Sequence, residues 1–284
     1  MTGVLVTGGT GKTGSVLAAL LRGQGVPVRV AGRTPAAGDP DAIRFDWNDP
    51  RTHPAALRGM DRVFLVPPVQ SVHPLPLVGP FLAEAQRLGV RRVVLLGSAI
   101  VLPNAPSALE LVARVRAQPG WAVLRASGFM QNFLRPHPLG ERIRRHGEIR
   151  TAAGEGRVGW IDVRDIAAAA SALLTDPAVE TDDRRDYLLT GPKALSYADA
   201  AATITTGTGR PVRVVHIDAD EQAANYRAAG IPAEFAHALA AVEDSIRGGR
   251  EDQVSTDVLG LTGRPPRTFT EFVDQHAKEW AVMP

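Results

Sequence analysis

The chain of 284 residues contains no cysteine, which excludes disulfide bonds, thiolate nucleophiles and cysteine-ligated metals. Aromatic residues make up only 5% of it, and no apolar run reaches the length of a membrane-spanning helix. The formal net charge is +2, and the dispersed arginines disfavour a nucleic-acid-binding face. The seven histidines show no metal-ligand spacing, so we expect no metal and a surface or loop role for each of them. Because a strand pattern begins almost at once, without room for a signal peptide, we expect a cytoplasmic protein.

What the sequence does contain is a glycine-rich segment near its start. Val4 to Val6 form a short apolar run typical of a strand, and Ser15 to Leu21 begin a helical pattern. The glycines between them follow the dinucleotide fingerprint, in which glycines allow a tight turn, a close backbone approach to pyrophosphate and close helix packing. The helix N-terminus then holds the anion. The predicted nucleotide site comprises Gly8, Thr10, Gly11, Lys12, Thr13 and Gly14, with Gly9 in the overlapping spacing.

The end of the second predicted strand, at Gly32, indicates which cofactor binds. An acidic residue about 20 positions after the glycines would hold the ribose hydroxyls of NAD. Here that zone carries Arg33 and Thr34, and the first carboxylate is Asp39. A guanidinium offers forked, charged donors that suit a 2′-phosphate, so we predict NADP(H) as cofactor with Arg33 as a ligand. The alternative is an arginine that is simply solvated.

Apolar strand-like runs, such as the continuous runs Val63–Val66 and Val93–Leu96, alternate with helical patterns over the first 190 residues. This alternation is typical of right-handed β-α-β crossovers, so we predict an α/β fold with a Rossmann-type, doubly wound parallel sheet. From about residue 192 the pattern changes to short helices around one β-rich stretch at 211–217. We therefore predict an NADP-binding domain over 1–190, with an excursion at about 134–160 toward a small, mostly helical substrate-binding lobe over 191–284.

Ligands of open parallel sheets lie beyond the carboxyl ends of the strands, which selects further candidates. Asp46 is placed to accept a hydrogen bond from adenine, although a turn-capping role is equally consistent with its position. Pro67 and Pro68 are expected to wall the cofactor after the fourth strand. Residues 128–133 follow the sixth strand, where Phe129 is expected to line the substrate pocket and Asn132 is a further candidate; core packing is the alternative for this apolar stretch.

The chain resembles the NmrA-like atypical short-chain dehydrogenase/reductases, and within them the branch of ergot-alkaloid-biosynthesis-type reductases. The resemblance runs through nearly the whole chain, at residues 6–14, 124–125, 128–133, 160–167, 187–192, 195–197 and 269–272. It implies a Rossmann domain, NADP(H), and a C-terminal lobe that closes over a hydrophobic substrate. It also implies cofactor or substrate contacts for Gly8, Gly11, Gly14, Arg33 and Phe129.

One departure from short-chain dehydrogenases concerns the catalytic acid. By the resemblance, Ser98 occupies the position of their catalytic serine, and a Tyr-x-x-x-Lys motif is expected in the next helix. Residues 107–117 contain neither tyrosine nor lysine, and none of Tyr187, Tyr197 and Tyr226 is followed by lysine four residues later. Reduction of a ketone needs a proton donor, whereas an iminium ion accepts hydride and becomes a neutral amine. We therefore predict an NADPH-dependent reductase of an iminium or a strongly polarised enone or quinone.

Several weaker features have ordinary structural interpretations. Asp162 and Asp165 flank a helix start, where Asp commonly caps the helix or balances its dipole. Arg142, Arg144 and Arg145 are expected to form a solvated helix face, and Glu110 faces either the site or solvent. A second function class also stays open, a non-catalytic NADP(H)-sensing regulator that binds a partner. As partners we expect a hydrophobic small molecule, no nucleic acid and no membrane, and a monomer or homodimer.

Overall fold

The chain begins with β1 (Val4–Val6), a glycine turn and α1 (Lys12–Gly23). A computed structural model describes residues 3–100, 106–175 and 186–280. All three residues of β1 are fully buried, and Leu17 and Leu21 of α1 are buried on the helix face that packs on the sheet. The predicted strand–turn–helix arrangement is therefore confirmed. None of the helices in the described ranges combines the length and apolarity that a membrane span requires.

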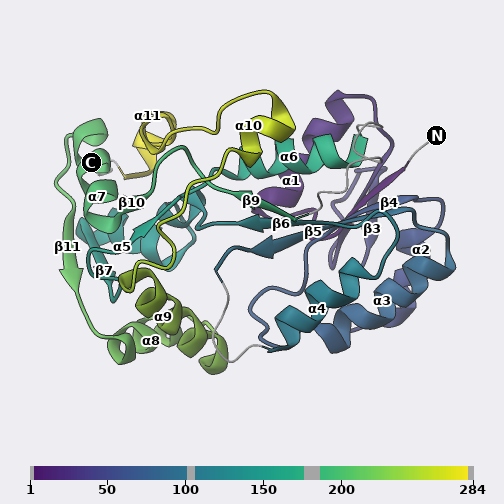
Figure 1. Ribbon diagram of the computed structural model, residues 1–284, viewed down its shortest axis with the longest axis horizontal. Helices are drawn as coiled ribbons and strands as arrows, with labels where there is room; N and C mark the ends of the chain where they lie inside the picture. Colours follow the sequence, from purple (N-terminus) through teal and green to yellow (C-terminus); the bar gives the residue numbers. More distant parts are fainter. Residues whose placement is uncertain (1–2, 101–105, 176–185, 281–284) are drawn as a thin grey trace. The chain divides into compact units, whose positions relative to one another are not determined.

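A seven-stranded sheet forms the centre of the first part of the chain (Figure 1). Its strand order is β3-β2-β1-β4-β5-β6-β9, and β1 pairs in parallel with both β2 and β4. The other strands are β2 (Val28–Gly32), β3 (Ala42–Arg44), β4 (Arg62–Leu65), β5 (Arg92–Ser98), β6 (Ala122–Ala126) and β9 (Asp186–Leu189). The strand order reverses at β1, so the point between β1 and β4 is where such sheets bind ligands. The Rossmann-type prediction is confirmed.

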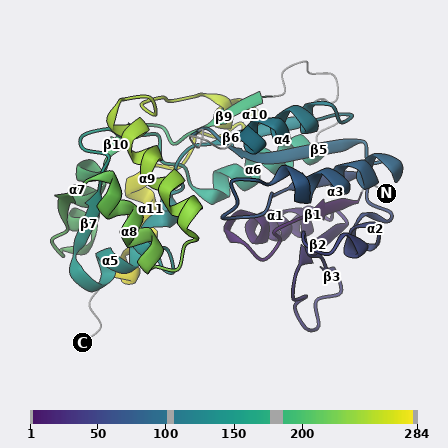
Figure 2. The ribbon, with the colours of Figure 1, turned by 90° about the horizontal axis from the view of Figure 1, so that it is seen from below.

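Helices cover both faces of this sheet (Figures 1 and 2). On one face lie α1 and α6 (Val163–Thr175), and on the other lie α2 (His53–Leu57), α3 (Leu75–Arg87) and α4 (Pro106–Arg116). Arg62 and Arg92 are buried where β4 and β5 begin, and they donate to the carbonyl oxygens of Leu174 and Leu173 at the end of α6. These guanidinium groups satisfy carbonyls that the last helical turn leaves unpaired.

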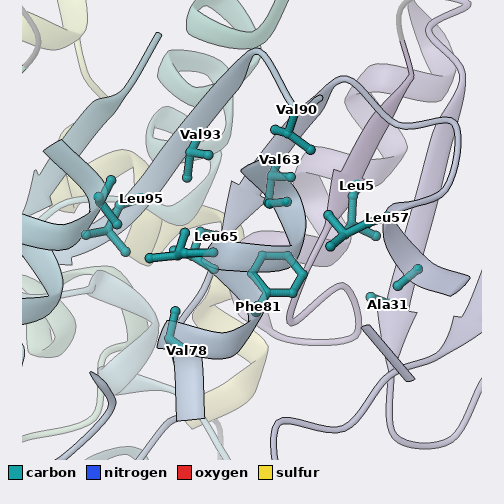
Figure 3. Packing of buried hydrophobic residues seen from close by; sticks show 14 of the residues in the cluster. Leu5, Ala31, Leu57, Val63, Leu65, Val78, Phe81, Val90, Val93 and Leu95 are labelled. Carbon is teal, nitrogen blue, oxygen red and sulfur yellow. The ribbon is translucent and has the colours of Figure 1, made fainter. Parts of the chain in front are cut away.

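A hydrophobic core of this sheet lies under α2, α3 and α4 (Figure 3). Alternate strand residues supply it, such as Leu5, Val63 and Val93, because successive side chains of a strand point to opposite faces. Phe81 of α3 and Leu57 of α2 pack on them and are fully buried. His53 belongs to the same region: it is 1% exposed and stacks on the Phe45 ring at 5.0 Å. The surface or loop role expected for the histidines is wrong for His53.

The chain folds into two compact units, one of Met1–Ser98, Ala105–Arg125 and Ile166–Tyr187, the other of Ala99–Asn104, Ala126–Asp165 and Leu188–Pro284. The second unit therefore includes a longer middle stretch than the excursion expected at 134–160. Its helices are α5 (Pro138–His146), α7 (Tyr197–Thr208), α8 (Ala219–Ala228), α9 (Ala233–Arg247), α10 (Asp257–Thr262) and α11 (Phe269–Trp280). Its mostly helical character agrees with the expected C-terminal lobe.

Two small sheets complete the second unit. β7 (Glu148–Thr151) pairs in parallel with β11 (Arg213–His216), and β8 (Arg157–Val158) pairs antiparallel with β10 (Leu195–Ser196). Aromatic rings fill the core between these sheets and the helices; Phe133 lies 5.0 Å from Trp160 and 4.9 Å from Phe269, between ring centroids.

Arg142 of α5 corrects a sequence prediction. The side chain was expected on a solvated helix face. Its Nη1 instead donates to the buried carboxylate of Glu148 at 2.8 Å. The sequence pattern shows α5 as a run of charges, and only the neighbouring strand reveals that one of them has a buried partner.

Candidate functional site

The glycine turn is held by backbone hydrogen bonds to the strands beside it. Gly9 N donates to Ala31 O of β2 at 3.2 Å, and Gly11 N donates to Gly8 O within the turn at 2.9 Å. Gly8 has φ of 60°, a left-handed conformation that glycine adopts without strain. These contacts fix the turn between β1 and α1, so its outward-facing backbone is preorganised for a ligand.

The turn glycines differ in the space around them. A Cβ on Gly14 would lie 2.3 Å from Gly8 O, and one on Gly9 would lie 2.4 Å from a methyl group of Val30. A Cβ on Gly11 would approach only Gly8 O, at 3.1 Å, and its φ of −82° suits any residue. Gly9 and Gly14 are therefore required by packing, whereas Gly11 leaves open the space over the helix N-terminus.

That helix N-terminus has donors to offer. Gly11 caps α1 without a side-chain hydrogen bond, so the first amide groups of α1 retain their capacity to bind an anion. Thr13 Oγ1 is buried and has no hydrogen-bond partner among the described residues. Desolvation lowers the pKa of Lys12, whose side chain stands beside the same turn. Open backbone, a free hydroxyl and a cation fit the pyrophosphate of a dinucleotide.

A cavity of about 230 Å³ opens beside the turn, between α1 and the segment that follows β2. Gly9 and Thr10 line it from the turn, Ser15 and Arg22 from α1, and Thr34 and Asp39 from the segment after β2. Arg33 is exposed next to this cavity and makes no hydrogen bond or ion pair with the residues that the structure describes. Its role as a ligand of a 2′-phosphate stays a prediction.

The remaining candidates of the first unit lie where its strands end. Asp46, after β3, is half-buried, and its Oδ1 accepts from Asn48 N at 3.0 Å. The turn-capping role is therefore present, and a contact to adenine stays a prediction. Pro67 and Pro68 follow β4 and are half-buried, and Ser98 is the exposed last residue of β5. The parallel pairing of β1, β4 and β5 brings the glycine turn, the two prolines and Ser98 to one edge of the sheet.

Phe129 and Asn132 belong to the second unit. Phe129 precedes a short 3-10 helix, η2 (Met130–Phe133), and pairs with Ile161 in an isolated β-bridge. Met130 and Phe133 are core residues, whereas Phe129 and Asn132 are half-buried. The stretch 128–133 thus divides between core packing and surface, and the roles of Phe129 and Asn132 as pocket residues stay predictions.

The three tyrosines are all buried or engaged. Tyr187 and Tyr197 are 3% and 8% exposed, and Tyr226 donates through its hydroxyl to Glu243 Oε1 at 2.8 Å. Burial and the nearby Glu243 carboxylate raise the pKa values of both Tyr197 and Tyr226 well above 10. A phenol with a raised pKa is a poor proton donor at neutral pH. No sequence pattern marked Glu243, because its partners come from α8, β7 and the residue that follows β7, all distant from α9 in sequence.

Glu243 is fully satisfied by its neighbours. Its Oε1 also accepts from Gln222 Nε2 at 2.6 Å, while Oε2 accepts from Thr151 Oγ1 at 2.9 Å and Ala152 N at 2.6 Å. Four donors to one buried carboxylate describe a structural anchor between β7, α8 and α9.

The two aspartates predicted at the start of α6, Asp162 and Asp165, each accept hydrogen bonds from an arginine. Asp162 caps the start of α6 by accepting from Arg164 N at 2.8 Å, and it pairs with the Arg164 guanidinium at 2.6 Å. Asp165 instead accepts from Arg267 N at 2.8 Å and forms an ion pair with that side chain. The sequence indicated the cap but not the long-range arginine.

Comparison with known proteins agrees with a nucleotide site at the glycine turn. A family model described as NAD(P)H-binding matches residues 8–177. The uncharacterized oxidoreductase YesF of Bacillus subtilis (strain 168) is 40% identical over 279 residues, which cover 98% of this chain and 96% of that protein. Agroclavine dehydrogenase of Claviceps fusiformis is 34% identical over 290 residues, 98% of this chain and 99% of that protein.

A solved structure shares the fold. The NADPH-dependent quinone oxidoreductase of Escherichia coli, crystallised in complex with NADPH, superposes with a TM-score of 0.79 at 22% identity, over 96% of this chain and 99% of that chain. The family match covers more than half of this chain, and the relatives match nearly all of it. The chain therefore belongs to the NAD(P)H-binding family of NmrA-like, atypical short-chain dehydrogenase/reductases and is an NAD(P)H-dependent oxidoreductase.

Proposed function

We propose that this oxidoreductase transfers hydride from NADPH to an iminium ion, or to a strongly polarised C=C or C=O group, of a hydrophobic small molecule. The observation that carries the proposal is the composition of α4, the helix that follows Ser98, where Pro106–Arg116 contains neither tyrosine nor lysine. The tyrosines elsewhere do not replace the missing acid, because Tyr197 and Tyr226 are buried with raised pKa values and Tyr226 already donates to Glu243.

The chemistry of the acceptor decides whether an acid is needed. A simple ketone becomes an alkoxide, which requires a proton from a positioned group at the transition state. An iminium carries positive charge and becomes neutral, so the protein needs only to bind the two reactants in line and exclude competing water. Ser98, exposed at the end of β5, supplies a hydroxyl suited to orienting a polar atom of the substrate.

The finer family assignment is part of the same proposal. The branch of ergot-alkaloid-biosynthesis-type reductases is supported by agroclavine dehydrogenase, at 34% identity over 98% of this chain. A cationic nitrogen in an otherwise apolar molecule is the substrate class that this relationship and the missing acid both favour. We further propose that the protein acts as a monomer or homodimer. We favour the enzyme over the regulatory alternative because relatives that match nearly the whole chain are oxidoreductases.

The test compares three acceptors of similar size with NADPH in steady-state kinetics: an N-methylated cyclic iminium, a quinone and a simple cyclic ketone. The iminium has no N–H proton to lose, so its charge stays constant below the pH at which hydroxide adds to it, and rates are compared within that range. We expect kcat/KM for the iminium or the quinone to exceed that for the ketone by about 10³-fold, the contribution of a general acid that this protein lacks. With the iminium, kcat should stay flat toward high pH. Efficient ketone reduction that declines as pH rises would contradict the mechanism.

Substitutions of Ser98 and the three tyrosines test whether any of these residues donates a proton during the reaction. Ser98→Ala should lower kcat about tenfold at most, an orienting effect of about 1.4 kcal/mol. Tyr187→Phe, Tyr197→Phe and Tyr226→Phe should each leave kcat for the iminium nearly unchanged, although Tyr226→Phe should lower the melting temperature because Glu243 loses a donor. A loss of about 10³-fold in kcat in a folded Tyr→Phe variant would identify a recruited acid.

Cofactor choice is tested through Arg33. Because this exposed guanidinium stands where other dinucleotide-binding proteins carry an acidic residue, NADPH should bind more tightly than NADH by about 1–3 kcal/mol. Arg33→Ala should remove most of the difference without changing the melting temperature, since Arg33 makes no described contact. Calorimetry on the unaltered protein decides: equal affinities for the two cofactors would overturn the assignment.

A further inference from the structure

Arg22, in the last turn of α1, donates hydrogen bonds to two carboxylates of the segment between β2 and β3. Its Nη2 lies 2.7 Å from Asp39 Oδ1 and 2.9 Å from Asp39 Oδ2, and its Nε lies 2.9 Å from Asp41 Oδ2. Asp41 N also donates to Asp39 Oδ1 at 3.0 Å, which fixes the two aspartates relative to each other. A single guanidinium therefore faces two carboxylates, and it lowers the pKa of Asp39.

This cluster borders the cavity beside the glycine turn. Arg22 and Asp39 both line that cavity, together with Thr10 of the turn and Thr34 after β2. Asp39 and Asp41 are also the first carboxylates of the chain, since residues 1–38 contain none. The first negative charges that follow β2 along the chain are thus the charges that Arg22 compensates.

We infer that Arg22 determines cofactor specificity by masking Asp39 and Asp41, so that the cavity accepts the 2′-phosphate of NADPH rather than repelling it. This inference rests on the proposed preference for NADPH. Like charges within a Debye length, about 10 Å at 0.1 M ionic strength, repel with little screening when they border a partly closed cavity. With Arg22 removed, the loop would present an acidic residue near the ribose, which is the arrangement that favours NAD.

The experiment measures dissociation constants of NADP⁺ and NAD⁺ by calorimetry for the unaltered protein, Arg22→Ala, Asp39→Asn, and the triple variant Arg22→Ala with Asp39→Asn and Asp41→Asn. We expect Arg22→Ala to weaken NADP⁺ about tenfold and to leave NAD⁺ nearly unchanged. The triple variant should recover NADP⁺ binding to within about threefold, because the carboxylates are gone as well. The loss in Arg22→Ala should shrink at high salt.

Asp39→Asn separates masking from mere positioning of the loop. If Arg22 only pins the loop, Asp39→Asn breaks the same contact and should weaken NADP⁺ as much as Arg22→Ala does. If Arg22 masks charge, Asp39→Asn should leave NADP⁺ binding unchanged or tighter. Arg87→Ala is the matched control, since Arg87 forms a similar exposed two-pronged pair with Glu84, 2.7 Å for each bond, on α3. It should change neither constant.

Two failures have different meanings. Equal affinities of the unaltered protein for NADP⁺ and NAD⁺ would reject the proposed cofactor preference. The dissociation constant of NADP⁺ for Arg22→Ala is divided by that for the unaltered protein. This ratio tests masking even if the unaltered protein binds both cofactors equally. A ratio of NADP⁺ to NAD⁺ affinity that Arg22→Ala does not change, or that the triple variant does not restore, would overturn the inference.

Discussion

Single residues of the glycine turn serve different purposes, which a matched pair of substitutions separates. Gly11→Val should abolish NADPH binding while the protein stays folded, because the φ of Gly11 suits valine and the branched side chain would occupy the space over the helix N-terminus. Gly14→Val should instead unfold or strongly destabilise the protein, since its Cβ would lie 2.3 Å from Gly8 O. Thermal unfolding and NADPH titration distinguish the two outcomes. Undiminished affinity in folded Gly11→Val would reject the role of Gly11.

The glycine turn was predictable from sequence because it depends on local backbone. Its glycines follow from spacing along the chain, since a dinucleotide turn has a fixed length, whereas the role of Arg33 stays a prediction. Arg142, His53 and Glu243 could not be predicted in this way. Each is defined by partners distant in sequence or on other elements, such as Thr151 for Glu243, so its burial becomes visible only in the folded chain.

Elements with a clear apolar run were likewise predictable, even the three-residue strand β1, whereas the two-residue strands and one short helix were not. β4 and β5 were identified from continuous apolar runs, which strands covered on both faces require. β8 and β10 have two residues each, and α10 has six, too few to show a period. β7 escaped prediction because Glu148 and Arg150 interrupt its apolar pattern, although their charges neutralise each other in the structure.

The pairing of β7 with β11 depends on Glu148, whose carboxylate accepts from Arg142, Arg150 and Arg213. Hydrogen bonds from Arg150 and Arg213 lower the pKa of Glu148 from 4.5 to about 2. A lowered folded-state pKa stabilises the protein above the ordinary value, and that stabilisation is lost as pH falls from about 4.5 toward 2. Glu148→Gln should therefore lower the free energy of unfolding at pH 7 by about 3 kcal/mol, measured by urea denaturation.

Two comparisons make this prediction specific. The gap between the unaltered protein and Glu148→Gln should be constant from neutral pH down to about 5 and should narrow below that. Glu221→Gln removes an exposed carboxylate that pairs with the same Arg150 at 3.0 Å, and it should cost less than about 1 kcal/mol. Equal effects of the two substitutions would show that burial of Glu148 contributes nothing.

At the scale of the whole molecule, each unit has its own hydrophobic core. The first contains Leu5, Val63 and Phe81, and the second contains Phe133, Trp160 and Phe272. The first unit contains the predicted cofactor ligands of the glycine turn together with Arg33 and Ser98, whereas Phe129 and Asn132 belong to the second. Cofactor chemistry was predictable because it is carried by one continuous β-α-β segment. The substrate was not, because its candidate residues Phe129 and Asn132 lie in another stretch of the chain and belong to the other unit.

The uncapped start of α1 has a consequence for how such a protein diversifies. The groups at this helix start that can bind an anion are backbone amides, which every amino acid except proline possesses. Larger side chains at the turn would block these amides without removing them. Substitutions at other positions of the chain therefore leave this contribution of the backbone amides intact. One ancestral hydride donor site can then serve many descendant acceptors, each selected by residues that the turn does not constrain.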